Sequence, residues 1–165
     1  MEFNIITWLK VEQSGLMFQG LYHHQLDSKG RASLPASFRK ILAGEREESL
    51  VIVKIHEQCL RAYPNSSWKQ LVDGISKKST LNPEVARFKR RVVGFAREVS
   101  LDKLGRILIP SDLRQKASVD REVVFVGSVQ YIEIWSKLQW DLEEAKLDQA
   151  FDDEEIFKAL DGLEI

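Results

Sequence analysis

The 165-residue chain contains only one cysteine, Cys59, and four prolines. A single cysteine cannot form an internal disulfide bond, which is typical of proteins in a reducing compartment. No apolar run approaches the roughly 18 residues that cross a bilayer. The N-terminus also lacks the cationic segment and long apolar stretch of a secretory signal. We therefore expect a cytoplasmic protein that does not associate with a membrane.

Motifs for nucleotide cofactors and for catalysis are missing as well. Neither the G-x-x-x-x-G-K-[ST] loop nor the G-x-G-x-x-G loop occurs. His23 and His24 are adjacent, so they would point to opposite faces of a strand, and His56 with Cys59 would offer only two metal ligands. A nucleophilic Cys–His pair lacks a recognisable third group. The sequence therefore predicts no cofactor, no metal ion, no small-molecule substrate and no enzymatic activity.

Charge is distributed unevenly, although the net charge is only −1. Residues 141–165 hold ten acidic residues and two lysines, whereas residues 1–140 hold 22 basic and 15 acidic residues. A basic body followed by an acidic tail is the pattern expected of a protein that binds a polyanion. A soluble protein with an ordinary solvated tail would show it too, and charge alone favours that second interpretation.

A thirteen-residue pattern occurs twice and indicates an internal duplication. Residues 27–39 and 102–114 both obey D-x-x-G-R-x-x-[LI]-P-x-x-[FL]-R, at an offset of 75 residues. Later segments match at an offset of 72, including the aromatic residues Tyr63, Trp68, Trp135 and Trp140. A repeat of this length predicts two copies of one folding unit. The recurrent aromatic residues are expected to pack in the core and not to stack on bases.

Each copy is predicted to form a strand, a tight turn, a return strand, a helix opened by proline, and a strand pair followed by a helix. In the first copy these elements are expected at residues 21–26, 27–30, 31–34, 36–42, 50–53, 59–63 and from 64 onward, and in the second copy the strand pair is expected at 123–126 and 131–135. Residues 84–95 are predicted to be a connecting helix. Its basic face (Arg87, Lys89, Arg90 and Arg91) is interpreted as solvated, with accessory phosphate contacts as the alternative.

This pattern divides the chain into five parts. They are an N-terminal extension (1–16), a first unit (21–67), a helical connector (68–96), a second unit (97–140) and an acidic tail (141–165). The extension is expected to be disordered or not translated, because Met17 is followed directly by the repeated region.

Two residue types of the repeated turn have structural roles. Gly30 and Gly105 stand where the chain must take a positive φ, as in a type I turn closed by a bulge. Asp27 and Asp102 stand at the start of the turns, where a carboxylate can accept hydrogen bonds from backbone N–H groups. We expect these carboxylates to orient the turns, with the arginine four residues later either in the same hairpin or in the other copy.

The basic residues of the turns are the candidate binding residues. Arg31 and Arg106 follow the turn glycines, and the planar guanidinium group suits bidentate contacts with phosphate or guanine. Lys29 lies at the tip of the first turn, and Lys103 lies beside the tip of the second. Because two-stranded ribbons can enter the major groove, the pair of basic hairpins predicts a DNA-binding surface, with Arg31 as its centre.

These residues resemble the MraZ family of bacterial transcriptional regulators. The resemblance runs from residue 17 to residue 140 and is strongest at Leu26–Arg31, Leu101–Pro110 and Ile132–Trp135. The family's D-x-x-x-R motif falls on Asp27 with Arg31 and on Asp102 with Arg106. The resemblance therefore implies that both copies of the motif are intact.

The resemblance also implies a fold and a function. The fold would be α+β and mainly β, with tandem AbrB/SpoVT-like swapped-hairpin repeats that form one pseudo-twofold β-barrel with short flanking helices. The protein would bind double-stranded DNA in the nucleoid as a ring-shaped homo-oligomer, on short direct repeats upstream of its own operon in the division and cell-wall gene cluster. The alternative is an oligomeric protein-interaction or antitoxin-like module whose DNA binding is incidental.

Overall fold

The computed structural model describes residues 17–55, 58–150 and 154–160. The expected N-terminal extension (1–16) and His56 lie outside these ranges. Within them, every helix is too short or too polar to cross a bilayer.

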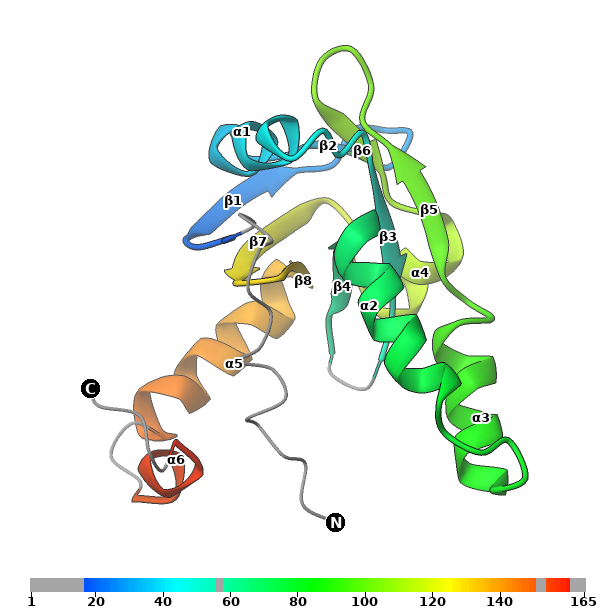
Figure 1. Ribbon diagram of the computed structural model, residues 1–165. Helices are drawn as coiled ribbons and strands as arrows, with labels where there is room; N and C mark the ends of the chain where they lie inside the picture. The colour runs from blue at the N-terminus through cyan, green and yellow to red at the C-terminus, as the bar shows by residue number, and fades with distance from the viewer. Residues whose placement is uncertain (1–16, 56–57, 151–153, 161–165) are drawn as a thin grey trace.

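The secondary structure repeats in the order that the duplicated sequence predicts (Figure 1). The elements are β1 (Leu21–Gln25), β2 (Arg31–Ser33), α1 (Ala36–Gly44), β3 (Ser49–Val53), β4 (Leu60–Pro64), α2 (Asn65–Ser76), α3 (Pro83–Val92), β5 (Arg97–Ser100), β6 (Arg106–Leu108), α4 (Ser111–Lys116), β7 (Glu122–Ser128), β8 (Tyr131–Ser136), α5 (Lys137–Ala150) and α6 (Glu154–Ala159). The series β1-β2-α1-β3-β4-α2 recurs as β5-β6-α4-β7-β8-α5. The described elements therefore form two consecutive series of the same order. Helices α2 and α5 cross the positions 67 and 140 at which the sequence predicts unit boundaries.

The two copies exchange strands. Six strands form a sheet in the order β1-β7-β8-β4-β3-β5, and β2 pairs with β6 in a separate two-stranded sheet. All of these pairs are antiparallel. The first strand of each copy thus pairs with the third strand of the other copy. The sheet order is also symmetric: at each position counted from one edge, the strand is the equivalent, in the other copy, of the strand at that position counted from the other edge.

The expected β-barrel is wrong, because the sheet does not close. β1 and β5 are its two edges, and each is hydrogen-bonded to one neighbouring strand within the described residues. The physical reason is the turn after each edge strand: it leads the chain out of the large sheet into β2 or β6, which pair only with one another. The α+β, mainly antiparallel class is confirmed.

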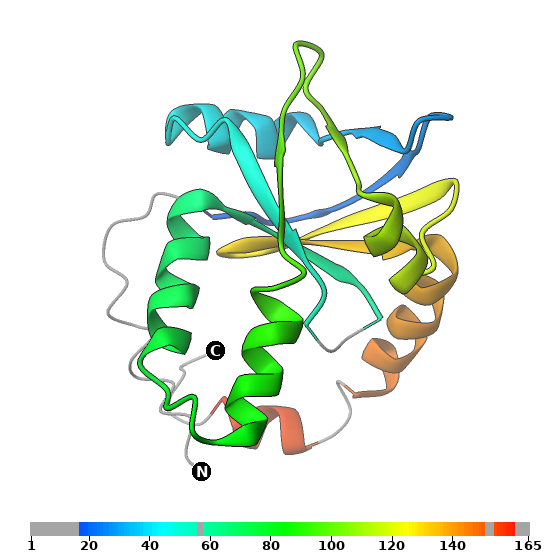
Figure 2. The same cartoon turned by 90° about the vertical axis from the view of Figure 1, so that its right-hand side faces the viewer.

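Side chains alternate between two apolar layers on the faces of the six-stranded sheet. Phe125 of β7 faces the main core, together with Phe38 of α1 and Leu113 of α4. Its neighbour Val124 faces the opposite way and packs against Trp140 of α5. Figure 2 shows the result, with α1 and the β2–β6 ribbon on one side of the sheet and α2, α3 and α5 on the other.

The recurrent aromatic residues pack against the second face of the sheet, as the sequence predicts. Tyr63 and Trp68 have ring centroids 5.9 Å apart, and the equivalent pair Trp135 and Trp140 has centroids 5.7 Å apart. Tyr63, Trp135 and Trp140 are buried, with 5–6% of their surface exposed. These aromatic side chains therefore fasten α2 and α5 to the sheet.

The connecting helix α3 contacts the protein through several of its basic residues. Asn82 caps the helix by accepting a hydrogen bond from the N–H of Glu84, and Pro83 occupies the first turn. The ammonium group of Lys89 donates to the carbonyl oxygen of Lys78, and Arg91 Nε donates to the carbonyl of Ile55. Together with an ion pair between Arg87 and Glu84, these contacts engage three of the four basic side chains of α3 within the protein.

Candidate nucleic-acid interface

The first repeated turn is held by one carboxylate. Asp27 Oδ1 accepts hydrogen bonds from the backbone N–H groups of Lys29 and Arg31, both at 2.9 Å. Its Oδ2 accepts from Arg31 Nε at 2.7 Å. The backbone closes the turn through Gly30 N–H to Asp27 O, and Gly30 has a φ of 82°. The Asp27 carboxylate and the positive φ of Gly30 therefore shape this turn.

The second turn has the same geometry at equivalent residues. Asp102 Oδ1 accepts from the N–H groups of Leu104 and Arg106 at 2.9 and 3.0 Å, and Oδ2 accepts from Arg106 Nε at 2.7 Å. Gly105 has a φ of 72°. Each Asp/Arg pair therefore binds within its own hairpin.

The same contacts stabilise the ionised form of both carboxylates. The hydrogen bond from the Arg31 N–H, followed by the Arg31 side chain and the Lys29 N–H, lowers the pKa of Asp27 to about 2. The equivalent hydrogen bonds, led by the Arg106 N–H, lower the pKa of Asp102. Both turns thus keep a negative charge that orients an arginine across the physiological pH range.

The β2–β6 ribbon brings the two turns together. Its register places Arg31 opposite Leu108 and Ser33 opposite Arg106. Backbone hydrogen bonds extend the pairing at both ends, from Leu34 N–H to Gly105 O and from Ile109 N–H to Gly30 O, each 3.0 Å. Each turn is therefore fastened to the return strand of the other copy.

One ion pair also crosses between the copies. Arg106 Nη1 lies 3.9 Å from Asp27 Oδ2, the oxygen that binds Arg31. Asp27 thus contacts the arginines of both turns. The sequence leaves open whether each aspartate binds an arginine of its own hairpin or of the other copy, and Asp27 does both.

Arg39 and Arg114, the last residues of the two repeated patterns, also belong to this site, although they are not among the sequence-based candidates. Each lies against the turn of the opposite copy: a Cβ built on Gly30 would come within 2.7 Å of Arg114 Cζ, and one on Gly105 within 2.7 Å of Arg39 Nη1. Arg114 Nε also donates to Ile109 O at 3.1 Å. The recurrence of an arginine at the end of both repeated patterns was the sequence feature that could have identified them. Their position beside the opposite turn depends on the exchange of strands between the copies, which the pattern does not show.

The ribbon has an inner and an outer face. Ala32 and Ile107 are buried in the core, whereas the alternate residues of both strands are partly or fully exposed. The outer residues are Arg31, Ser33, Arg106 and Leu108. With the exposed Lys29 and Lys103 and with Arg39 and Arg114, the ribbon and its turns carry six basic side chains against two carboxylates. We call this the ribbon surface.

Comparison with known proteins identifies the family. Residues 17–91 and 93–160 match the model of the family described as "MraZ protein, putative antitoxin-like". The chain is 41% identical over 125 residues to "Transcriptional regulator MraZ" of Lachnoclostridium phytofermentans, covering 76% of this chain and 85% of the relative. It is 37% identical over 149 residues to the protein of that name from Caldanaerobacter subterraneus subsp. tengcongensis, covering 90% of this chain and all of the relative.

The chain belongs to the MraZ family. A third relative, from Thermomicrobium roseum, has the same name and is 39% identical over 124 residues, covering 75% of this chain and 84% of the relative. These names describe transcriptional regulators and not enzymes, in agreement with the sequence-based expectation.

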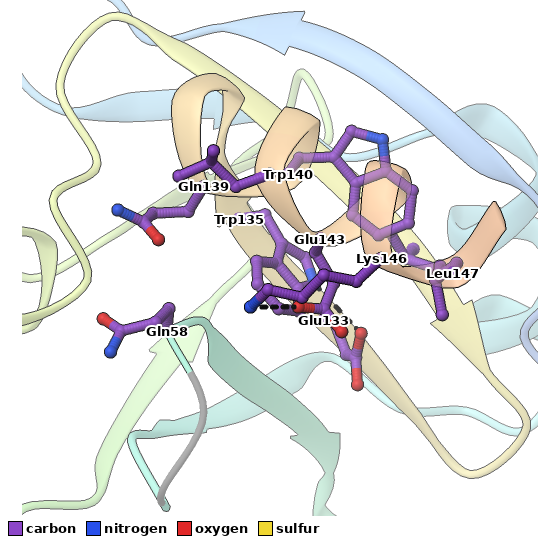
Figure 3. Close-up of a pocket in the computed structure, with 10 residues that line it drawn as sticks. Gln58, Glu133, Trp135, Gln139, Trp140, Glu143, Lys146 and Leu147 are labelled. Atoms are coloured by element: carbon purple, nitrogen blue, oxygen red, sulfur yellow. Dashed lines mark hydrogen bonds and ion pairs between the residues drawn. The ribbon is translucent and has the colours of Figure 1, made fainter. Parts of the chain in front are cut away.

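A hollow of about 770 Å³ lies elsewhere in this MraZ-family chain, between α5 and the sheet (Figure 3). Trp135 and Trp140 form part of its wall, with Gln58 from the connection between β3 and β4 and Lys146 from α5. The Trp135 indole donates a hydrogen bond to Glu133 Oε2 at 2.9 Å, so its polar atom is used within the wall. Both views of the fold place α5 away from the ribbon surface.

The described residues considered for metal binding are His23, His24 and Cys59. Within the described ranges no group of three or more His, Cys, Asp or Glu side chains could hold a metal ion. His24 packs edge-on against Phe125, with ring centroids 5.6 Å apart, while its neighbour His23 is exposed. Cys59 is buried beside Trp135 and Trp140.

Proposed function

We propose that this chain is a transcriptional regulator that binds double-stranded DNA in a sequence-specific way through the ribbon surface. The observation that supports this most strongly is the placement of Arg31 and Arg106 on one face of a two-stranded ribbon, each oriented by an aspartate. The names of the relatives support the regulatory role.

The dimensions of the ribbon suit the major groove, which admits a two-stranded β-ribbon. Side chains two residues apart on one strand, such as Arg31 and Ser33 or Arg106 and Leu108, lie about 7 Å from one another, close to two base-pair steps of about 3.4 Å. Arg31 and Arg106 can then approach guanine edges or phosphates, while Lys29 and Lys103 contact the flanking backbone. Asp27 and Asp102 hold the two guanidinium groups in place.

The finer proposals concern assembly and target. We propose that the chain has the swapped-hairpin architecture of the AbrB/SpoVT type, which the exchange of β1 and β5 between copies supports. It would assemble as a ring-shaped homo-oligomer in the nucleoid and bind short direct repeats upstream of its own operon in the division and cell-wall gene cluster. Simultaneous binding of adjacent repeats would multiply weak individual contacts into a high affinity.

A footprint on the upstream DNA, followed by titration of variants across a salt series, tests the proposal. Arg31→Ala is expected to weaken binding and to reduce the steepness of the salt dependence, because a charged contact to DNA is lost. Arg87→Ala is the matched control, since Arg87 is an exposed arginine of α3 with an ion pair to Glu84. Equal affinity of wild type and Arg31→Ala throughout the salt series would contradict the role of Arg31.

The competing function is an interaction module of the antitoxin-like kind that the family description mentions. In that case the hairpins would bind protein, and DNA binding at moderate salt would show no preference for the upstream fragment over unrelated DNA. A competition assay with both fragments, combined with a pulldown, separates the two functions.

A further inference from the structure

The ribbon surface is asymmetric at the side chains that the two copies do not share. Ser33 on β2 and Leu108 on β6 occupy equivalent positions, and both are on the outer face. At the turn tips, Lys29 of the first copy corresponds to Leu104 of the second. The second copy therefore presents apolar side chains where the first presents polar ones.

Leu108 contributes little to the core. Half of its surface is exposed, whereas its neighbour Ile107 is completely buried. The first copy forms the same strand with Ser33 at this position, so the ribbon geometry does not require leucine. Leucine at this position therefore leaves an apolar side chain exposed among charged ones, where it can contact a binding partner.

The neighbours of Leu108 indicate what it contacts. Arg31 lies directly opposite it in the ribbon register, and Arg106 is two residues before it on the same strand and the same face. Side chains opposite one another have Cβ atoms about 5 Å apart, and those two residues apart are separated by about 7 Å. Leu108 thus lies next to the two arginines that would enter the major groove.

Among the base edges in the major groove, thymine alone presents a methyl group, and apolar side chains recognise it by contact. We propose that Leu108 is a specificity-determining residue that packs against the 5-methyl group of a thymine beside the bases or phosphates contacted by Arg31. This inference rests on the proposed DNA-binding function. Because the equivalent Ser33 cannot make the same contact, one copy of the unit selects thymine at its position and the other does not. The bound site then has a direction.

The test uses a duplex with the footprinted site and a second duplex with deoxyuridine in place of thymidine, which removes only the methyl groups. The full-length wild-type chain is expected to bind the uracil duplex about fourfold more weakly for each contacted thymine, the value of one buried methyl-sized group. Leu108→Ser, which installs the residue of the first copy, is expected to bind both duplexes equally. Ser33→Ala and Leu104→Ser are the matched controls and should retain the wild-type discrimination.

Each outcome bears on a different claim. Equal discrimination by wild type and Leu108→Ser, including no discrimination by either, would overturn the thymine contact while leaving DNA binding in place. Loss of discrimination in Leu104→Ser instead would also overturn the role of Leu108. If the wild-type chain prefers neither the footprinted site nor unrelated DNA, the proposed function fails, and this inference fails with it. A circular dichroism spectrum of Leu108→Ser identical to that of wild type excludes misfolding as the cause.

Discussion

The guanidinium group of Arg114 lies against Gly30, so that the last residue of the second repeated pattern supports the turn of the first. Arg39 packs in the same way against Gly105. The two glycines therefore serve two purposes: they take a positive φ, and they leave room for an arginine of the other copy.

Replacing the turn glycine should destabilise the protein. Gly30→Ala places a side chain at a φ of 82° and forces Arg114 to move, so we expect a loss of ~1–2 kcal/mol in the free energy of unfolding. Gly74→Ala is the control, because Gly74 lies in helix α2 with no atom near its missing Cβ, and it should gain ~0.5–1 kcal/mol. Urea denaturation of the three proteins measures both changes, and a neutral Gly30→Ala would contradict the packing.

Removing a supporting arginine should loosen the turn of the opposite copy. In Arg114→Ala the amide hydrogens of Gly30 and Arg31 should exchange about fivefold faster, for a loss of ~1 kcal/mol in local stability. The amides of Gly105 and Arg106 should keep their rates. Arg39→Ala should show the reverse pattern, and hydrogen exchange followed by NMR resolves the four amides. A change confined to the mutated copy would show that the crossed packing is not significant.

Acid should weaken the first turn over a defined pH range. Because the folded protein lowers the pKa of Asp27 to about 2 from a usual value of 3.8, the stabilisation is present above pH 4 and lost as the pH falls toward 2. Asp27→Asn should lower stability at neutral pH and flatten the decline between pH 4 and pH 2. Denaturation curves collected from pH 2 to pH 6 measure this, and Asp102→Asn should behave in the same direction. An unchanged slope in both variants would argue against ionised turn carboxylates.

Cutting the chain between the copies should leave two halves that need each other. A break at Gly94, between α3 and β5, keeps every strand intact but makes the pairs β1–β7 and β3–β5 intermolecular. Co-expressed halves should therefore elute as a complex with equal amounts of each, and size-exclusion chromatography with light scattering measures the stoichiometry. Folded monomeric halves would contradict the strand exchange.

Local features of the turns were predictable because they depend on residues close in sequence. Asp27 and Arg31 are four residues apart and belong to the same turn. A carboxylate, a glycine and an arginine at this spacing therefore determine the hairpin geometry by themselves. Recurrence of the same spacing at Asp102 then predicts a second hairpin of the same kind. The strands and helices of each copy followed from apolar periodicity in the same way.

The relations between the copies were not predictable from the residues alone. The position of Arg39 beside Gly105 requires β2 to pair with β6, a contact across 75 residues that no local pattern specifies. The closed barrel was wrong for a related reason, because the sequence shows strands without showing which edges remain open. The apolar residues of α3 also differ in burial, because the helix contacts the sheet through Val92 at its end, whereas Phe88 is 43% exposed.

Pairing of β1 with β7 also constrains how the protein is made. Leu21 pairs with Val126, which is synthesised more than 100 residues later, and Arg31 pairs with Leu108, which is also synthesised much later. Long-range pairing of this kind delays folding until both partners are available. A nascent or prematurely terminated chain that lacks β6 therefore cannot assemble the paired ribbon and cannot compete for its binding partner.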